Sequence, residues 1–231
     1  MTSSICHINR KQCALARTAT SGSIQTEPNR TTPFTWFYDI KITLQIPILL
    51  VLCMLIGSGT RAATLEGQQF SDVVRLGNRE LRLNGLGVRK ILFIKVYVAG
   101  LYLNDAAATP SEVSNMPGPK RLQLRMLRSA GAEDFSDALV NGMRNSVNVT
   151  EGIRLAERIN QLDLTIRTVG AAAKGDIIAL DYIPEIGTRL TVNGANHGKV
   201  ISGADFYEAV LALFIGNKPV DTQLKRGLLG Q

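Results

Sequence analysis

The chain has 231 residues and a formal net charge of +7, but its charges and its cysteines are unevenly distributed. Residues 1–62 hold six Lys and Arg against two Asp and Glu, which leaves 20 basic and 17 acidic residues, a net charge of +3, in residues 63–231. A balance this mild, with both signs interspersed, argues against a nucleic-acid groove. All three cysteines lie in the first part, and the second has one histidine, His197. These counts exclude a disulfide framework, a cysteine zinc cluster and a multi-histidine metal site from the second part.

The first part contains a segment typical of a secretory signal, at about residues 41–62. Lys41 precedes an apolar run, residues 46–57, and small residues follow up to Ala62. We therefore expect an exported protein, periplasmic or secreted, that is cleaved near Ala62. The alternative is an uncleaved membrane anchor, although the run is shorter than the roughly 20 residues that span a bilayer. The part before the run is longer than in an ordinary signal peptide, so the true start codon and the synthesis of residues 1–40 stay open.

The second part, residues 63–231, is long enough to bury one sizeable core and is predicted to form one domain. Apolar and polar residues alternate at 71–76 and at 79–85, on either side of a Gly-Asn pair, which predicts a β-hairpin. Residues 91–103 are apolar on both faces of a strand. This pattern is typical of a strand that is covered on both sides.

The remaining elements follow in a strand, helix, strand, helix order. A turn region at 109–119 precedes a strand at 120–127 with one apolar face and one face that meets water or a polar cavity. Apolar residues at helical spacing then predict two amphipathic helices, over 132–147 and 150–169. Turn signals and alternation predict the rest: strands at 177–184, 188–194 and 199–203, a helix at 204–216, and a short helix after Pro219. This order predicts an α+β fold, an antiparallel sheet with helices packed on one face.

Two patterns in this part look functional but do not carry chemistry. Gly85 and Gly87 fail as a nucleotide-binding loop, because Lys90 occupies the place of the third glycine and a strand follows instead of a helix. His197 lies among turn residues, where a solvated loop histidine is the simplest interpretation. No pair of carboxylates has a spacing that suggests a general acid and a general base.

Arg89, just ahead of the apolar run that carries Tyr97, is the remaining candidate. An arginine does not lose its charge on burial, so an inward-pointing Arg89 needs an anion or several acceptors beside it. Its planar fork suits a carboxylate. The pattern alone leaves three interpretations: Arg89 lies in a solvated turn, pairs with a protein carboxylate, or holds an anionic ligand.

The stretch FIKVYVAGLYLND resembles a strand of the chalcone isomerase fold, in which a glycine-rich turn containing arginine precedes a FIK-x-T-A-x-G-V-Y-L-x pattern. Further pieces resemble the family in the same order: MPGPKRLQLRML, AEDFSDALVNGM, KGDIIALDYIP and LALFIGNKPVDTQLKRGLLG. The resemblance covers about residues 66–230 and looks closest to the bacterial, exported branch of the family. It implies an open-faced β-sandwich: a large antiparallel sheet, helices layered on one face, and a ligand cleft between them.

Chalcone isomerases cyclise a chalcone to a flavanone without a cofactor, and the resemblance carries their site residues onto this chain with several changes. The family's arginine corresponds to Arg89. Its threonine falls on Tyr97, and its tyrosine falls on Asp134 or, with a shift of one residue, on Phe135. Its asparagine is retained as Asn141 if Asp134 is the match.

The family's Ser or Thr near the last long helix falls on Leu213, which is apolar. With these hydroxyl groups changed, the resemblance does not imply chalcone isomerisation, since each such group can supply orders of magnitude in rate. An arginine beneath an apolar cleft is instead similar to the arrangement in the fatty-acid-binding relatives of the superfamily. We therefore expect a non-catalytic protein that binds a fatty-acid-like or other small amphipathic carboxylate through Arg89, with Tyr97 and Asn141 beside it.

Two other functions stay open. One is an intramolecular lyase or isomerase of the chalcone isomerase type, acting on an unknown phenolic or enone substrate with Arg89 as a catalytic residue and Tyr97 in place of the missing hydroxyls. The other is a structural or partner-binding periplasmic protein in which Arg89 pairs internally. No metal, cofactor or nucleic-acid partner is expected, and a membrane is expected as a partner only through the signal segment if it is uncleaved.

Overall fold

A computed structural model describes residues 62–231, so the predicted signal segment before Ala62 lies outside the described residues. Seven strands form one antiparallel sheet in chain order, from β3 to β9, and β1 and β2 form a separate hairpin. The strands are β1 (Ala62–Leu65), β2 (Gln68–Ser71), β3 (Val73–Leu76), β4 (Arg79–Ile91), β5 (Ile94–Leu103), β6 (Lys120–Met126), β7 (Ile177–Ile183), β8 (Gly187–Val192) and β9 (Ala195–Ile201). The helices are α2 (Pro110–Asn115), α3 (Ala132–Ser146), α4 (Val149–Val169), α5 (Ala204–Ile215) and α6 (Thr222–Leu228).

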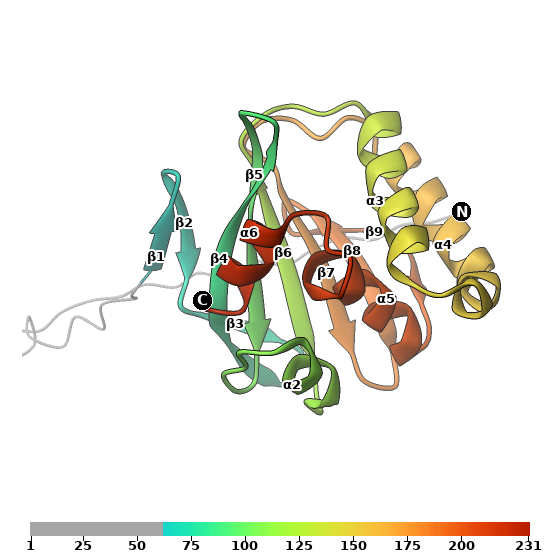
Figure 1. The fold of residues 1–231 in the computed structure, drawn as a ribbon, viewed down its shortest axis with the longest axis horizontal. Helices are drawn as coiled ribbons and strands as arrows, with labels where there is room; N and C mark the ends of the chain where they lie inside the picture. Colours follow the sequence, from blue (N-terminus) through green and yellow to red (C-terminus); the bar gives the residue numbers. More distant parts are fainter. Residues whose placement is uncertain (1–61) are drawn as a thin grey trace, which may run out of the picture. The chain divides into compact units, whose positions relative to one another are not determined.

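The predicted α+β fold is confirmed: the sheet is curled, and the helices pack on it (Figure 1). Helix α5 is apolar on nearly all sides, with eight buried residues, because it lies between the sheet and the outer pair α3 and α4. Helix α6 contacts β4 and β5. The main core therefore lies on the helix face of the sheet. None of the helices within 62–231 is both long enough and apolar enough to cross a bilayer.

The opposite face of the sheet has a smaller core of its own. Phe70 of β2 is fully buried against Val98 and Tyr102 of β5. Farther along this face, Arg121 donates two hydrogen bonds, of 2.6 and 2.7 Å, to the fully buried carboxylate of Asp181. The polar face predicted for residues 120–127 is thus covered by protein: Arg121 bonds Asp181 of β7, and the guanidinium of Arg125 lies over the Phe70 ring.

The predicted turn region at 109–119 contains a helix instead, α2. The hydroxyl of Thr109 accepts a hydrogen bond from the backbone N–H of Glu112, and the carboxylate of Glu112 accepts one from the N–H of Thr109. Pro110 occupies the first turn, where its missing N–H costs nothing. This capping box stabilises a short helix among turn-forming residues, so the prediction of a turn was wrong here.

The predicted glycine-rich turn around Arg89 is also wrong, because β4 continues as a strand to Ile91. The turn starts three residues after Arg89, at Leu92 and Phe93, inside the apolar run that was predicted to be covered on both faces. Side chains 91–94 are exposed, and burial begins only at Val96. The apolar run is therefore a hairpin tip followed by a buried strand.

His197 lies in strand β9, which begins at Ala195, and not in a loop as the sequence predicted. The Asn193-Gly194 turn before it is where the sequence placed it, with both residues at positive φ (51° and 84°). The strand starts earlier than predicted because pairing with β8 resumes directly after this tight turn.

Candidate functional site

A cavity of about 150 Å³ lies on the helix face of the sheet, between β4, β5 and β6 and the helices α3 and α5. Its wall is mostly apolar, with contributions from Val96, Leu124 and Leu213. The polar members of the wall are Arg89, Tyr97 and Asp134. The cavity is therefore an apolar space with a few polar groups, the usual form of a small-molecule site.

Arg89 and Tyr97 meet in this cavity because they are direct cross-strand partners of β4 and β5. Cross-strand partners leave the sheet on the same face, with their Cβ atoms close together. Tyr97 is 8% exposed, and its hydroxyl forms no hydrogen bond with any residue of the described part. The pair thus offers a guanidinium and a phenol to one small space.

Two glycines of β4 place Arg89 at the edge of helix α6. A Cβ atom on Gly87 would lie 2.5 Å from the carbonyl oxygen of Leu224, and one on Gly85 would collide with the backbone of Gly227. Glycine at both positions lets α6 lie directly on the strand. Arg89 is the next residue on that face of β4, and its side chain lies beside the amino-terminal end of α6.

The N-cap of α6, Asp221, is the protein carboxylate beside Arg89. Its Oδ1 accepts hydrogen bonds from the N–H groups of Gln223 (2.8 Å) and Leu224 (3.1 Å). Its Oδ2 accepts one from the N–H of Lys90 (3.1 Å) and lies 3.5 Å from Nη1 of Arg89. Asp221 therefore joins the α6 cap to the end of β4 and fixes the direction of Arg89.

The same contacts set the charge state of Asp221. Burial would raise the pKa of its carboxyl, but the three backbone N–H groups and the Arg89 guanidinium more than offset this and hold the pKa below its usual value. Asp221 is consequently ionised at neutral pH.

Arg89 keeps donors available beyond these contacts. Nη1 donates to the carbonyl of Lys90 at 2.6 Å and faces Asp221, while Nε and Nη2 form no hydrogen bond with residues 62–231. The side chain is 21% exposed, so it lies at the rim of the cavity and is neither fully solvated nor sealed in the core. A guanidinium in this position can bind a carboxylate through two parallel N–H groups.

Tyr97 stays a neutral phenol in this setting. Burial raises the pKa of its hydroxyl, and the nearby Asp221 raises it further, whereas the Arg89 guanidinium opposes the shift only in part. A phenol that keeps its proton donates a hydrogen bond to an anion and does not act as a general base near neutral pH.

Helix α3 closes the cavity from above with Asp134, Phe135, Ala138 and Leu139, which follow each other at helical spacing. The helix approaches α5 closely at Gly142, where a Cβ atom would overlap the side chain of Leu213. This close contact holds the apolar face of α3 beside α5, and together the two helices form the wall of the cavity opposite the sheet.

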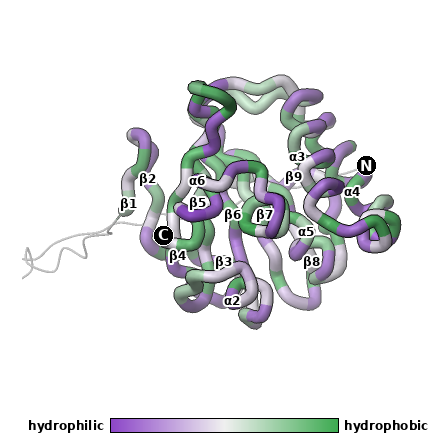
Figure 2. The backbone as a smooth tube through the Cα atoms, viewed as in Figure 1, coloured by the Kyte–Doolittle hydropathy of each residue, from purple (hydrophilic) through white to green (hydrophobic). Residues whose placement is uncertain are grey.

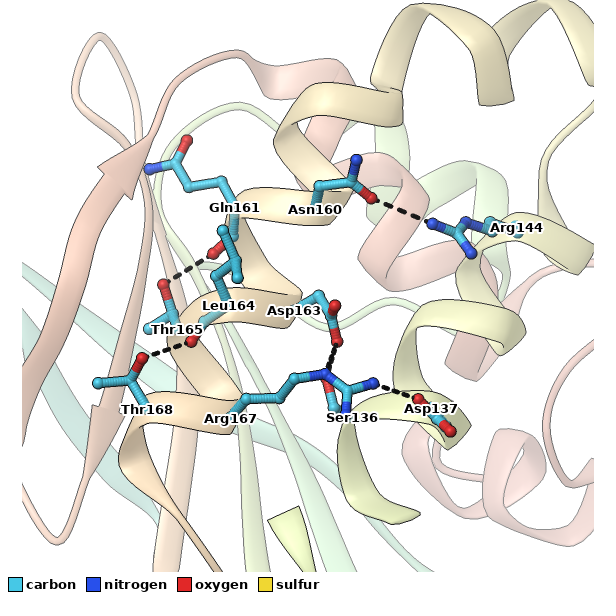
Figure 3. Close-up of polar contacts among 10 residues, drawn as sticks. All are labelled: Ser136, Asp137, Arg144, Asn160, Gln161, Asp163, Leu164, Thr165, Arg167 and Thr168. Atoms are coloured by element: carbon cyan, nitrogen blue, oxygen red, sulfur yellow. Dashed lines mark hydrogen bonds and ion pairs between the residues drawn. The ribbon is translucent and has the colours of Figure 1, made fainter. Parts of the chain in front are cut away.

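Polar contacts with α4 hold the other side of α3 (Figure 3). Arg167 donates hydrogen bonds to Asp163 on its own helix and to Asp137 on α3. The Ser136 hydroxyl donates to Asp163. These ion pairs are partly exposed and individually weak, but together they fix the rotation of α3 that points Phe135 into the cavity.

Phe135 separates the cavity from a second, smaller space. This second cavity, of about 20 Å³, is lined by Phe135 and by apolar residues of α4, β7 and β8, among them Ile166 and Leu190. Since the same aromatic ring belongs to both walls, a rotation or truncation of Phe135 would join the two spaces.

The structure brings together most, but not all, of the residues that the sequence singled out. Arg89 and Tyr97 line the cavity, and so do both candidates for the family tyrosine. Asn141 is exposed on α3 and does not line the cavity, in contrast to its predicted place beside Arg89. It lies two turns beyond Asp134 on the same helix, past the end of the space.

Sequence reasoning missed Asp221. Its N-cap role could have been recognised, because an aspartate two residues after Pro219 precedes the last helix. Its contact with Arg89 could not, since 132 residues separate the two along the chain.

A larger groove, of about 590 Å³, runs between α4 and β9 and includes His197. Its polar side chains largely bond to neighbouring protein groups. Asn160 accepts a hydrogen bond from Arg144, and the hydroxyl of Thr165 donates to the carbonyl of Gln161 (Figure 3). The two charged residues of the groove, Glu157 and Lys199, are exposed to solvent, in contrast to the largely buried Arg89. The larger volume of the groove therefore does not make it the better candidate site. Among the described residues, no cluster of His, Cys, Asp or Glu is placed to hold a metal ion.

No curated protein sequence matches the chain. Among solved structures, a fatty-acid binding protein of Arabidopsis thaliana superposes with a TM-score of 0.59 at 19% sequence identity, covering 73% of this chain and 96% of the other. This similarity shows a shared fold.

A sequence model of the family described as chalcone isomerase-like matches residues 62–230. This range is most of the chain, and it contains every strand and helix described above as well as the cavity with Arg89. The chain belongs to the chalcone isomerase-like family.

Proposed function

We propose that this protein binds a small amphipathic carboxylate, such as a fatty acid, in the cavity beside Arg89, and that it is not an enzyme. The observation that carries the proposal is the pairing of Arg89 and Tyr97 at one end of an otherwise apolar space. A carboxylate would accept hydrogen bonds from Nε and Nη2 of Arg89 and from the Tyr97 hydroxyl. Its tail would lie against Leu124, Leu213 and their apolar neighbours.

The size of the cavity sets the scale of the ligand. A space of about 150 Å³ holds a molecule of roughly benzene size, about six carbon atoms. A short acyl chain fits this space as it stands. A longer chain needs the second cavity behind Phe135, so the position of that ring would set the length that is accepted.

The comparisons support a lipid-like ligand but do not identify one. The solved structure of similar fold is described as a fatty-acid binding protein, and at 19% identity that description does not transfer to this chain by itself. It agrees with the proposal drawn from the cavity.

An isomerase acting on a phenolic substrate is the competing proposal, because the free nitrogens of Arg89 would also suit a phenolate. Two features of the cavity count against it. Sites for molecules with several rings are usually about 300 Å³ or larger, about twice the volume found here. The hydroxyls implied by the family resemblance are also missing, since Phe135 and Leu213 contribute only apolar surface.

The proposal includes export from the cytoplasm, in the bacterial exported branch of the family. Support comes from the order of Lys41, the apolar run at 46–57 and the small residues up to Ala62. The family match begins at residue 62, close to the predicted cleavage point. Amino-terminal sequencing of the protein purified from its natural host would test this part, with a start near Ala63 as the expected result.

Native mass spectrometry of the purified chain tests the binding proposal. We expect a population with added mass that corresponds to a carboxylic acid, and we expect Arg89→Gln to lose it. Arg82→Gln is the matched control, because Arg82 is an exposed arginine of the same strand without a role in the cavity. An unloaded wild-type protein that also fails to take up added hexanoate or decanoate contradicts the proposal, as does turnover of a chalcone that depends on Arg89.

A further inference from the structure

The turn between β4 and β5 exposes large apolar side chains. Phe93 is 98% exposed and Leu92 is 87% exposed, and Ile91 and Ile94 beside them are about half exposed. Ile91 pairs with Ile94, so the connection is a two-residue turn made of Leu92 and Phe93. Such turns usually contain Asn and Gly, because one or both of their residues adopt positive φ.

The choice of residues in this turn does not serve stability. Leu92 has a φ of 55°, a conformation that strains a side chain with a Cβ atom. Neither Leu92 nor Phe93 gains burial in return. A residue pair that costs conformational energy and leaves an apolar tip in water indicates a surface that binds something.

The form of the tip favours a lipid surface over a protein partner. The tip projects from one end of the sheet (Figure 1), and it has the green colour of hydrophobic residues in Figure 2. A stable protein interface buries about 800 Å² on each partner, much more than four side chains on a narrow hairpin supply. A few apolar side chains that enter the headgroup region suffice for reversible membrane binding when cations flank them.

Cations do flank the tip. Lys90 is exposed and forms no ion pair with residues 62–231, and Lys95 lies on the other side, where its Nζ is 2.6 Å from the carboxylate of Glu66. Arg128 is exposed on the neighbouring loop, which begins where the N–H of Leu127 bonds the carbonyl of Val96. Two acidic groups near this end are paired, Glu66 with Lys95 and Asp221 with Arg89. Asp134 of the cavity wall forms no ion pair with residues 62–231, but it lies on α3 and not on the hairpin that carries the tip.

The tip is continuous with the cavity. Ile91 belongs both to the exposed turn and to the cavity wall, and Arg89 precedes it by two residues on the same strand. A molecule that leaves a bilayer at the tip would therefore meet the apolar mouth and Arg89 without crossing open water.

We propose that the β4–β5 tip, Ile91–Ile94, inserts into the outer layer of an anionic lipid membrane and presents the cavity mouth to it. Lys90 lies at the level of the headgroups, and Leu92 and Phe93 enter the acyl region. The transfer of a ligand from the membrane rests on the proposed function, whereas insertion of the tip does not. The sequence suggested membrane contact only through the apolar leader segment, so this is a second and separate contact.

Tryptophan fluorescence with brominated lipids tests the insertion locally in the full chain. Trp36→Phe removes the natural tryptophan, and Phe93→Trp or, as a control, Leu164→Trp then introduces one reporter. Leu164 is exposed on α4, away from the tip. With vesicles of phosphatidylcholine and phosphatidylglycerol, we expect a blue shift and bromine quenching for Phe93→Trp but not for Leu164→Trp. Equal quenching at both positions, or none at either, overturns the proposal.

The charge part of the proposal has its own control. Lys90→Gln is expected to lower the affinity for the anionic vesicles about fivefold, the effect of removing one cation near such a surface. Lys199→Gln removes an exposed lysine of β9 and is expected to leave the affinity unchanged. An equal loss for both variants would mean a nonspecific charge effect and would contradict docking through the tip.

The double variant Leu92→Ser/Phe93→Ser separates this proposal from the proposed function. We expect it to bind a soluble carboxylate such as hexanoate as the wild type does, but to take up decanoate from vesicles at least several times more slowly. If the wild-type tip inserts into vesicles but the wild type does not bind hexanoate, the tip proposal stands and the proposed function is refuted. If the wild type binds hexanoate but its tip does not insert, the proposed function stands and the tip proposal is refuted.

Discussion

Arg89 combines two of the interpretations that its sequence context left open. It contacts a protein carboxylate, Asp221, through one nitrogen, and it lines the apolar cavity with others that have no partner among the described residues. The contact at 3.5 Å is long for a hydrogen bond, so Asp221 orients Arg89 without occupying its whole fork. Nε and Nη2 of Arg89 are therefore left for the carboxylate that the proposed function requires.

Phe135→Ala should lengthen the acyl chain that the protein prefers. Removing the ring joins the two cavities that share it, and each further methylene that is buried contributes about 0.8 kcal/mol, roughly fourfold in affinity. Titration with a series of fatty acids from four to twelve carbons measures the optimum. Phe135→Leu is the matched control and should shift the optimum less, and an unchanged optimum in Phe135→Ala would contradict the role assigned to the ring.

At the scale of residues, the sequence singled out two residues of the cavity wall, Arg89 and Tyr97, but not the protein carboxylate beside them. Arg89 was singled out because a charged residue directly precedes an apolar run, and Tyr97 because the threonine of the family pattern falls on it. Asn141 was expected at the site from the family resemblance, but it lies past the end of the cavity. Asp221 was missed because contacts between distant segments leave no local pattern.

Helix α6 is the element that fixes the geometry of the site. It lies on β4 at Gly85 and Gly87, and the side chain of Asn84 ties the strand to it by donating to the carbonyl of Leu228 at 2.8 Å. The amide of Asn84 also exchanges hydrogen bonds with the backbone of Ala107. The chain end of the domain is thereby tied to the strand that carries Arg89.

Gly87→Ala should lower stability by at least 1–3 kcal/mol, the usual cost of forcing extra atoms into a packed contact. The added methyl group would meet the backbone and side chain of Leu224. Gly152→Ala in helix α4 is the control with the opposite expected sign. A Cβ there would make only an ordinary contact, 3.8 Å from the side chain of Val147, and it should stabilise by about 0.5–1 kcal/mol. Urea unfolding of both variants measures the two signs, and equal stabilities would contradict the close packing of α6.

Asp221→Asn should make stability less dependent on pH in acid. The pKa of Asp221 is lowered in the folded state, so its contribution is present above the ordinary carboxyl range, near pH 4, and is lost as the pH falls through the lowered value. Asparagine keeps the cap but not the charge. We expect the variant to be about 0.5–1 kcal/mol less stable at pH 7, with the difference shrinking towards pH 2.

Thermal unfolding of the wild type and Asp221→Asn between pH 2 and pH 7 measures this difference. Other carboxyls with lowered pKa, such as Asp163 and Asp205, titrate in both proteins and cancel in the comparison. If the difference in stability between the wild type and Asp221→Asn grew as the pH fell, Asp221 would not be stabilised as an anion.

At the scale of elements, periodicity predicted most of the strands and helices. The helices α3 and α4 and the hairpin at Asn193-Gly194 were found because their signals are local. The β4–β5 turn was missed because it has the hydrophobicity of a buried strand and no turn-forming residue. The short helix α2 was missed because its capping box lies among Pro, Ser and Asn, residues that also favour turns.

At the scale of the whole domain, the cavity exists because segments far apart in the chain meet on one face of the sheet. The strands follow each other in chain order, so the order of elements alone predicted an antiparallel sheet with helices on one side. The walls of the cavity come from β4, β5, β6, α3 and α5 together. The side chains that surround the cavity depend on how α3 is rotated about its axis and on how closely α6 packs on β4. The spacing of apolar residues in the sequence predicts neither.

Calorimetric titration with pairs of ligands of equal length tests the central claim most directly. Hexanoate and hexanol, or octanoate and octanol, differ only in the group that Arg89 and Tyr97 would hold. We predict that the wild-type chain prefers the acid by about 10- to 100-fold, as expected for hydrogen bonds to a charged group, and that Arg89→Gln loses this preference while Arg82→Gln keeps it. Equal binding of acid and alcohol by the wild type, or an unchanged preference in Arg89→Gln, would contradict a carboxylate site at Arg89.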